Sequence, residues 1–213
     1  MENSETELQL PKVKKEKLWW EIVKTILIVG SIVFFVRFFI VQAYYILGSS
    51  MEPDYHNGEY LFIDEASYRV TQPHRGDVIV FKHPDETCTA FVESSPILKT
   101  FLQGPCRNYI KRIIGLPGET VKISEGKVTV YNNENPKGIT LSEPYIESGI
   151  QTLGDQKYVV GENEFFVLGD NRKPNASSDS RDWGLLQKKY IVGRAWIRLL
   201  PPSEAGIIKK PNY

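Results

Sequence analysis

Cysteine and histidine are scarce in this sequence of 213 residues, which has two cysteines and three histidines. Their positions suit neither a zinc site, nor an iron–sulfur cluster, nor a Cys-x-x-Cys redox pair. We therefore expect no metal and no other cofactor. The 26 basic and 26 acidic residues cancel, so net charge gives no reason to expect nucleic acid as a partner. Nothing in the sequence indicates an oligomer.

Long apolar runs are also few, and the one that stands out extends from Leu18 to Leu47. Four lysines precede it within residues 12–17. As a helix, Ile22–Ile40 would span about 28 Å, close to the thickness of a bilayer's hydrocarbon core. We predict a single membrane-spanning helix at residues 18–43 and thus a lipid bilayer as a partner.

The basic flank fixes the expected orientation of this helix. Cytoplasmic ends of membrane helices are enriched in Lys and Arg, so residues 1–17 are expected to be a cytoplasmic tail. The rest of the chain is then extracytoplasmic, at the cell (plasma) membrane. A cleavable signal peptide is the alternative, because it also combines a basic region with an apolar one.

Downstream of the apolar run, helical periodicity gives way to short strand-like stretches separated by turn residues. These predict a mainly β fold, a catalytic domain of irregular antiparallel sheets at residues 44–204, with a C-terminal tail at 205–213. Val121, Ile123, Val128 and Val130 flank a turn with a glycine, Gly126, which indicates a β-hairpin. The predicted strands are 60–63, 77–81, 120–123, 127–131, 164–168 and 192–199.

Ser50 lies in Gly-Ser-Ser-Met-Glu-Pro, just after the apolar run. Small residues permit a sharp turn, and Pro53 ends any helical continuation. A serine hydroxyl at this point suits a nucleophile, although a serine that only caps a helix is the ordinary interpretation.

Lys111 stands in an apolar alternating stretch, Tyr-Ile-Lys-Arg-Ile-Ile, at 109–114. In a strand it would share a face with Tyr109 and Ile113. Burial disfavours the charged ammonium, and a neutral amine can take a proton from a serine hydroxyl. The alternative is a lysine that extends from a strand edge into solvent.

A third stretch, residues 169–184, alternates carboxylates, amides, hydroxyls and guanidinium groups. Such a composition can form a buried network of hydrogen bonds and ion pairs that holds a site rigid. A polar surface loop has the same composition.

In this order, behind one membrane helix, these stretches resemble the sequence boxes of bacterial type I signal peptidases. The resemblance covers roughly residues 18 to 200. The boxes appear as Ser50-Met51-Glu52-Pro53, Arg75-Gly76-Asp77, Tyr109-Ile110-Lys111-Arg112 with Gly115-Leu116-Pro117-Gly118, Gly169-Asp170-Asn171-Arg172, and Asp179-Ser180-Arg181.

The resemblance implies a serine endopeptidase that removes signal peptides from exported preproteins with a Ser/Lys dyad, a variant of nucleophilic catalysis. Ser50 would be the nucleophile and Lys111 the general base. Ser177, rather than Ser178, would orient the lysine. Small residues would be preferred before the cut. The supporting residues implied are Asp170, Arg172, Asp179 and Arg181, and those of the substrate pocket are Ile46, Met51 and Ile110.

Two departures from the family pattern concern the segment before the nucleophile. Gly48 stands where some members have a serine whose hydroxyl donates to the oxyanion, which leaves the backbone N–H of Ser50 with an undetermined second donor. Leu47 replaces a common proline.

The insert at 83–108 holds both cysteines. In an oxidising compartment Cys88 and Cys106 would close a loop of about 19 residues, worth roughly 3 kcal/mol in the chain-entropy model.

Two other functions fit the same features. One is a related Ser/Lys processing peptidase with a different purpose. The other is a catalytically idle, membrane-tethered β domain that binds peptides.

Overall fold

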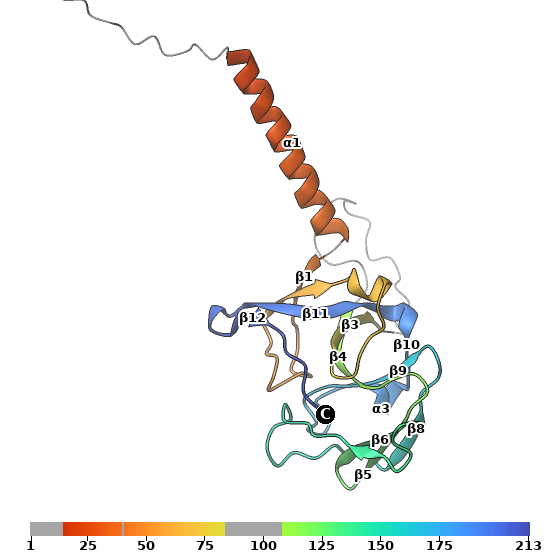
Figure 1. Cartoon of the computed structure of the whole chain (residues 1–213). Coiled ribbons are helices and arrows are strands. Elements are labelled where there is room, and N and C mark those ends of the chain that lie inside the picture. Colours follow the sequence, from red (N-terminus) through yellow and green to blue (C-terminus); the bar gives the residue numbers. More distant parts are fainter. Residues whose placement is uncertain (1–14, 40, 84–107) are drawn as a thin grey trace, which may run out of the picture. The chain divides into compact units, whose positions relative to one another are not determined.

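The computed structural model describes residues 15–39, 41–83 and 108–213 (Figure 1). The chain divides into two units, Met1–Ile40 and Val41–Tyr213. The predicted pairing of Cys88 with Cys106 lies outside the described residues.

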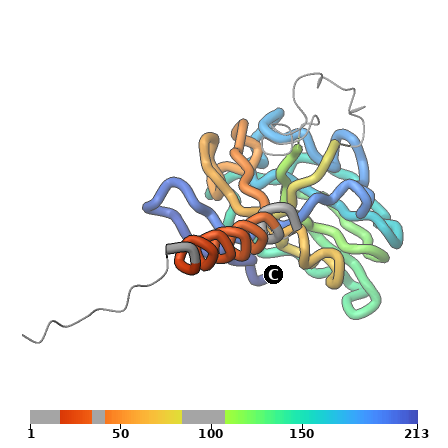
Figure 2. The backbone as a smooth tube through the Cα atoms, turned by 90° about the horizontal axis from the view of Figure 1, so that it is seen from above, coloured from red at the N-terminus to blue at the C-terminus, as the bar shows by residue number. Residues whose placement is uncertain are grey.

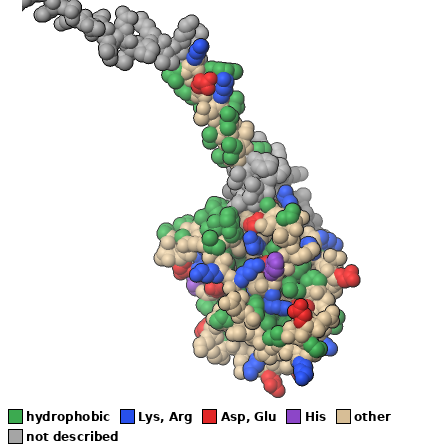
Figure 3. Space-filling view, in the orientation of Figure 1, with side chains coloured by type: hydrophobic (Ala, Val, Ile, Leu, Met, Phe, Trp, Pro, Cys, Tyr) green, Lys and Arg blue, Asp and Glu red, His purple; other side chains and the backbone are tan. Residues whose placement is uncertain are grey.

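The described part of the first unit is a helix, α1, at Lys15–Phe39. Figure 3 shows hydrophobic side chains along it, and Trp19, Ile28 and Phe34 are more than half exposed. Within the described ranges, no helix combines the length and apolarity that crossing a membrane requires.

The helix ends earlier than the sequence analysis predicted. Residues 41–43 were expected to be helical, but Val41–Tyr45 form strand β1, which pairs antiparallel with β2. Its side chains alternate, with Tyr44 buried and Tyr45 exposed, and this period of two fits a strand at the surface of a sheet.

The second unit is mainly β and built from antiparallel sheets, as predicted. The larger sheet has the order β1-β2-β11-β3-β4-β9-β10, with β12 beside β11. The smaller sheet has the order β7-β6-β5-β8. Strands β2 to β12 span Tyr60–Asp64, Val78–Lys82, Asn108–Gly115, Thr120–Ser124, Lys127–Tyr131, Ile139–Thr140, Gln156–Val159, Glu164–Leu168, Leu186–Gln187, Ile191–Leu200 and Gly206–Ile207. The short helices are η1 (Ser67–Arg69), α3 (Ser180–Trp183), η2 (Lys188–Tyr190) and η3 (Pro202–Glu204).

The predicted hairpin is present as β5–β6. Ser124 pairs with Lys127, and the two residues between them, Glu125 and Gly126, both have positive φ. Positive φ at both central positions is the geometry whose twist matches that of the flanking strands.

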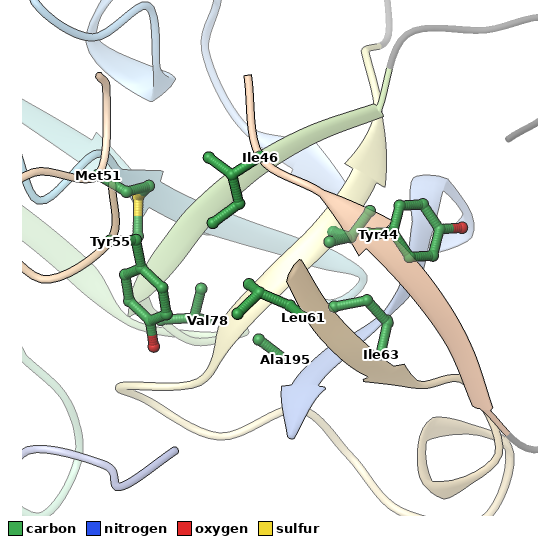
Figure 4. Packing of buried hydrophobic residues seen from close by; sticks show 9 residues of the cluster. Tyr44, Ile46, Met51, Tyr55, Leu61, Ile63, Val78 and Ala195 are labelled. Atoms are coloured by element: carbon green, nitrogen blue, oxygen red, sulfur yellow. The ribbon is translucent and has the colours of Figure 1, made fainter. Parts of the chain in front are cut away.

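Strand β11 joins parts of the chain that are distant in sequence. It pairs with β2 on one side and with β3 on the other. In Figure 2 its blue trace accordingly runs beside the orange and yellow segments. One hydrophobic cluster lies against these strands and contains Leu61, Ile63, Val78 and Ala195 (Figure 4).

Residues 205–213, predicted to be a tail, are part of the folded domain. Gly206–Ile207 form β12, and the chain then runs to the C-terminal end marked in Figure 1. Lys210 forms an ion pair with Asp77, and Tyr213 contacts Tyr145. These polar and aromatic contacts lie beyond the apolar pattern used to place the strands, so the sequence did not reveal them.

Candidate active site

Ser50 lies in the turn that follows β1. The glycine two residues before it, Gly48, has φ of 100°, a conformation that L side chains rarely adopt. The Gly48 N–H donates to Asn57 Oδ1 at 2.9 Å, and the Tyr55 N–H donates to the Met51 carbonyl at 2.9 Å. The serine is therefore held in a tightly bonded turn.

Lys111 lies in β4, between β3 and β9 in the larger sheet. It is opposite Ile79 of β3, and only 2% of its surface is exposed. Because β4 has a hydrogen-bonded strand on each side, the sheet fixes the backbone of the lysine, while its side chain is buried on one face of the sheet. The alternative of a lysine that extends into solvent is excluded.

The structure brings these two residues into direct contact. Lys111 Nζ donates to Ser50 Oγ at 2.7 Å and to the Ile110 carbonyl at 2.8 Å. Burial lowers the pKa of Lys111 from the usual 10.5 to about 8, against the opposing influence of Asp179 and Asp170. An amine with this pKa is partly neutral near neutral pH, so it can accept a proton from the serine.

Arg112 and Asp170 form a buried ion pair beside the lysine. Arg112 Nε donates to Asp170 Oδ1 at 2.8 Å, and Nη2 donates to Oδ2 at 2.6 Å. Asp54 also accepts from Nη2, at 2.9 Å. Such bidentate geometry fixes direction as well as distance, and it connects β4 to the segment that follows β9.

Asp179 is the centre of a second buried cluster. It accepts from Arg181 Nε and Nη2 at 2.8 and 2.9 Å, and from the Gly169 N–H at 3.1 Å. Burial alone would raise the pKa of Asp179, but the hydrogen bonds and charge of Arg181 hold it below its usual value. The carboxylate therefore remains charged close to the lysine.

Ser177 belongs to this cluster, because its hydroxyl donates to Asp179 Oδ2 at 2.9 Å. Ser177 is buried, whereas Ser178 is exposed. Among the described hydrogen bonds, those of Lys111 Nζ go to Ser50 and Ile110. With its proton given to Asp179, the Ser177 hydroxyl can act toward the lysine only as an acceptor.

Arg172 belongs to the same segment, which follows β9, and forms its own set of hydrogen bonds. Its Nε donates to the Gly169 carbonyl at 2.7 Å, and its Nη2 donates to Glu143 Oε1 at 2.5 Å. Thr152 also accepts from Arg172. Glu143 and Thr152 were not anticipated, because they lie in a stretch with no recognisable motif.

Asn171 and Gly169 lie in a sequence box named above, but no role was predicted for either residue. Asn171 donates through Nδ2 to the Ser49 carbonyl at 2.9 Å and through its N–H to the Ser50 carbonyl at 3.1 Å. A Cβ added at Gly169 would collide with the Ser50 carbonyl and the Ser177 hydroxyl. Asn171 and Gly169 thus restrict the position of the Ser49–Ser50 backbone.

The three residues expected in the substrate pocket lie in one cluster. Ile46 and Met51 are buried in it, and Ile110 packs against it while partly exposed. Figure 4 shows Ile46 and Met51 together with Tyr55. Ile110 also precedes the lysine and accepts its hydrogen bond, so the cluster adjoins the Ser50–Lys111 contact.

Comparison with known proteins accords with this arrangement. Residues 19–200 match the family described as "Signal peptidase, peptidase S26". Because the match covers most of the 213 residues, the chain belongs to this family.

Its relatives include named signal peptidases. A signal peptidase I from Leptolyngbya laminosa is 38% identical over 83% of this chain and 77% of its own length. A probable signal peptidase I-2 from Synechocystis sp. is 34% identical over 91% of this chain and 78% of its own. A crystal structure of a signal peptidase I from Enterococcus faecalis is 26% identical, with a TM-score of 0.41, covering 59% of this chain and 97% of that one. The protein is accordingly a serine endopeptidase that removes signal peptides.

Proposed function

We propose that Ser50 and Lys111 are the catalytic pair of this peptidase. Neutral Lys111 removes the proton of the Ser50 hydroxyl as the oxygen attacks the scissile carbonyl, and the resulting ammonium returns a proton to the leaving amine. The observation that carries this proposal is the 2.7 Å contact between a buried amine and the serine oxygen. No imidazole takes part.

The ion pairs act as supports in this mechanism. Asp170, Arg172, Asp179 and Arg181 shape the site, and Ser177 holds Asp179 next to the lysine. Asp179 and Asp170 also limit how far the pKa of Lys111 falls, because each favours the charged amine.

The oxyanion formed on attack would be stabilised by the Ser50 N–H. Gly48 has no hydroxyl to contribute, so the backbone supplies the first donor. A single such donor is worth roughly 10²-fold or more in rate.

Small apolar residues before the cut would contact the cluster of Ile46, Met51 and Ile110, in which Ile46 and Met51 are buried and Ile110 is partly exposed. The cluster supplies no charge for a polar side chain to pair with, and a buried unpaired polar group is costly. The proposed substrate is a preprotein whose signal peptide ends in small residues.

We propose further that the segment containing α1 holds the enzyme in the cell membrane, with the N-terminus in the cytoplasm and the catalytic domain outside. Support comes from the apolar run Ile22–Ile40, from the lysines before it, and from the exposed apolar side chains of the described part of α1. Membrane fractions extracted with alkaline carbonate should retain the full chain. Release of the intact chain into the soluble fraction would refute this anchor.

The dyad is tested with the full chain in detergent and a preprotein carrying an Ala-x-Ala site. Ser50→Ala and Lys111→Met should each abolish cleavage, whereas Ser49→Ala should leave it near the wild-type level. Cleavage by either dyad variant would disprove the mechanism. Substrate binding without cleavage by the wild type would favour the idle peptide-binding domain.

A further inference from the structure

The last eight residues of the sequence, Gly206–Tyr213, run from β12 to the C-terminal end marked in Figure 1, where they contact Gly76, Asp77 and Tyr145. We call them the C-terminal strap. The strap begins as a strand paired with β11, and the Ile208 N–H donates to the Trp196 carbonyl at 2.9 Å. Beyond this point its contacts with the domain include those of Lys210, Pro211 and Tyr213.

Lys210 attaches the strap to the segment before β3. Its Nζ lies 2.7 Å from Asp77 Oδ1, and the Asp77 side chain is 1% exposed. Asp77 also accepts from the Tyr68 hydroxyl at 2.7 Å and from the His74 N–H at 2.8 Å. Lys210 thus supplies a positive charge to the buried carboxylate of Asp77.

Tyr213 and Pro211 pack directly on Gly76. A Cβ added at Gly76 would lie 3.0 Å from Tyr213 Cε2 and 3.1 Å from Pro211 Cδ. The carbonyl of Gly76 accepts from Arg112 Nη1 at 3.1 Å. The strap therefore packs against Gly76, whose carbonyl accepts a hydrogen bond from Arg112, the residue next to Lys111.

Tyr213 reaches the same arginine by a second route, through Tyr145. The two hydroxyls are 3.2 Å apart. The ring of Tyr145 lies under the Arg112 guanidinium, with 4.1 Å between Cζ and the ring centroid. The Tyr145 hydroxyl donates to Glu143 Oε1, which also accepts from Arg172. Tyr213 thus contacts Tyr145, which stacks on Arg112 and is connected through Glu143 to Arg172.

We propose that the C-terminal strap is a positioning element of the Ser50–Lys111 pair and acts through Arg112. This inference rests on the proposed function of that pair. Arg112 directs Asp170, and Asp170 lies between Gly169 and Asn171, which contact the backbone of Ser50. Arg112 is also the chain neighbour of Lys111. A small displacement of the guanidinium therefore reaches both catalytic residues.

The test measures kcat and KM for cleavage of a preprotein by full-length variants in detergent. Tyr213→Ala should lower kcat by about tenfold with KM within about twofold, since misplacement of reacting groups by an ångström can cost 10²-fold. Tyr213→Phe keeps the ring and should retain most activity. Lys210→Gln should lower kcat about threefold, and its matched control is Lys209→Gln, an exposed neighbour that should behave as wild type.

A pH profile separates positioning from loss of folded protein. Lys111 is faced by Asp170 and Asp179, which are neutralised by Arg112 and Arg181. A less restrained Arg112 neutralises Asp170 less well, so in Tyr213→Ala the acid limb of kcat should move to higher pH.

Two results would overturn the inference. One is wild-type kcat in Tyr213→Ala. The other is a loss of activity that follows the fraction of folded enzyme with an unchanged pH profile. The Ser50→Ala variant tests the catalytic pair separately. If Ser50→Ala is inactive, the proposed pair stands, and a wild-type result for the strap variants then contradicts only the role of the strap.

Discussion

Lys111 Nζ lies 2.8 Å from the carbonyl oxygen of Ile110, the residue before it in the chain. The side chain therefore turns back on its own strand and gives one N–H to a fixed acceptor. A neutral amine so bound has its lone pair free for the Ser50 hydroxyl, 2.7 Å away. The backbone of β4 thus supplies the orientation that a carboxylate supplies to histidine in a Ser-His-Asp triad.

Cleavage should increase with pH, because only neutral Lys111 is a base. With a pKa of about 8, kcat/KM is expected to rise nearly tenfold per pH unit below about pH 7 and to level off above about pH 9. The measurement is the initial rate on a peptide without groups that titrate in this range. A flat profile between about pH 6 and pH 10 would contradict the assignment of the base.

Replacement of the lysine should stabilise the folded protein at neutral pH. The pKa of Lys111 is lower in the folded state, about 8 against the usual 10.5, so folding at pH 7 must bury a charged amine. The wild type regains this stability only as pH rises from 8 toward 10.5.

Lys111→Met should therefore raise the free energy of unfolding at pH 7 by about 2–3 kcal/mol, an order-of-magnitude figure. The advantage should shrink above pH 8. Denaturant unfolding of both proteins at pH 7 and pH 10 checks this, and an equal difference at the two pH values would refute it.

Asn171 should matter for rate more than for binding. Its side chain donates to the Ser49 carbonyl and its N–H to the Ser50 carbonyl. Asn171→Asp removes the side-chain donor with little change in size and should lower kcat about tenfold, since the nucleophile loses a restraint. The exposed Asn133→Ala serves as control. A wild-type kcat in Asn171→Asp would mean that the turn around Ser50 keeps its conformation without the hydrogen bond from the Asn171 side chain.

A single methyl group at Gly169 should inactivate the enzyme. The space for a Cβ is occupied by the Ser50 carbonyl and the Ser177 hydroxyl, so Gly169→Ala must displace one or both. We expect kcat to fall by about 10² or more. Gly30→Ala, at a position with open space, is the matched control. Full activity of Gly169→Ala would show that the segment after β9 can move away from the nucleophile without consequence.

Much of the sheet structure could be predicted from residue patterns. The alternating valines and isoleucines of β5 and β6 and the glycine between them identified the hairpin. Strand β1 was missed, because its residues continue an apolar run that also fits a helix. The last residues were missed because Lys210 and Tyr213 are fixed by long-range contacts, which leave no periodic signal in the sequence.

The candidate site was partly predictable for a similar reason. Ser50 and Lys111, the proposed catalytic pair, lie in short motifs, so the sequence indicated both. Their supports include Glu143 and Tyr145, which act through Arg172 and Arg112 from a loop without a motif. Only the fold places these partners together. That Ser177 gives its proton to Asp179 is likewise a matter of geometry.

The place of β11 between β2 and β3 has a consequence during synthesis. The turn bearing Ser50 follows β1, the partner of β2, whereas Lys111 lies on β4, the partner of β3. The β1–β2 pair and the β3–β4 pair are joined by β11, which is translated after all four of these strands. A nascent chain that has not yet produced residues 191–200 lacks the strand that joins these two pairs. The peptidase should thus be inactive until residues 191–200 have been synthesised and have left the ribosome.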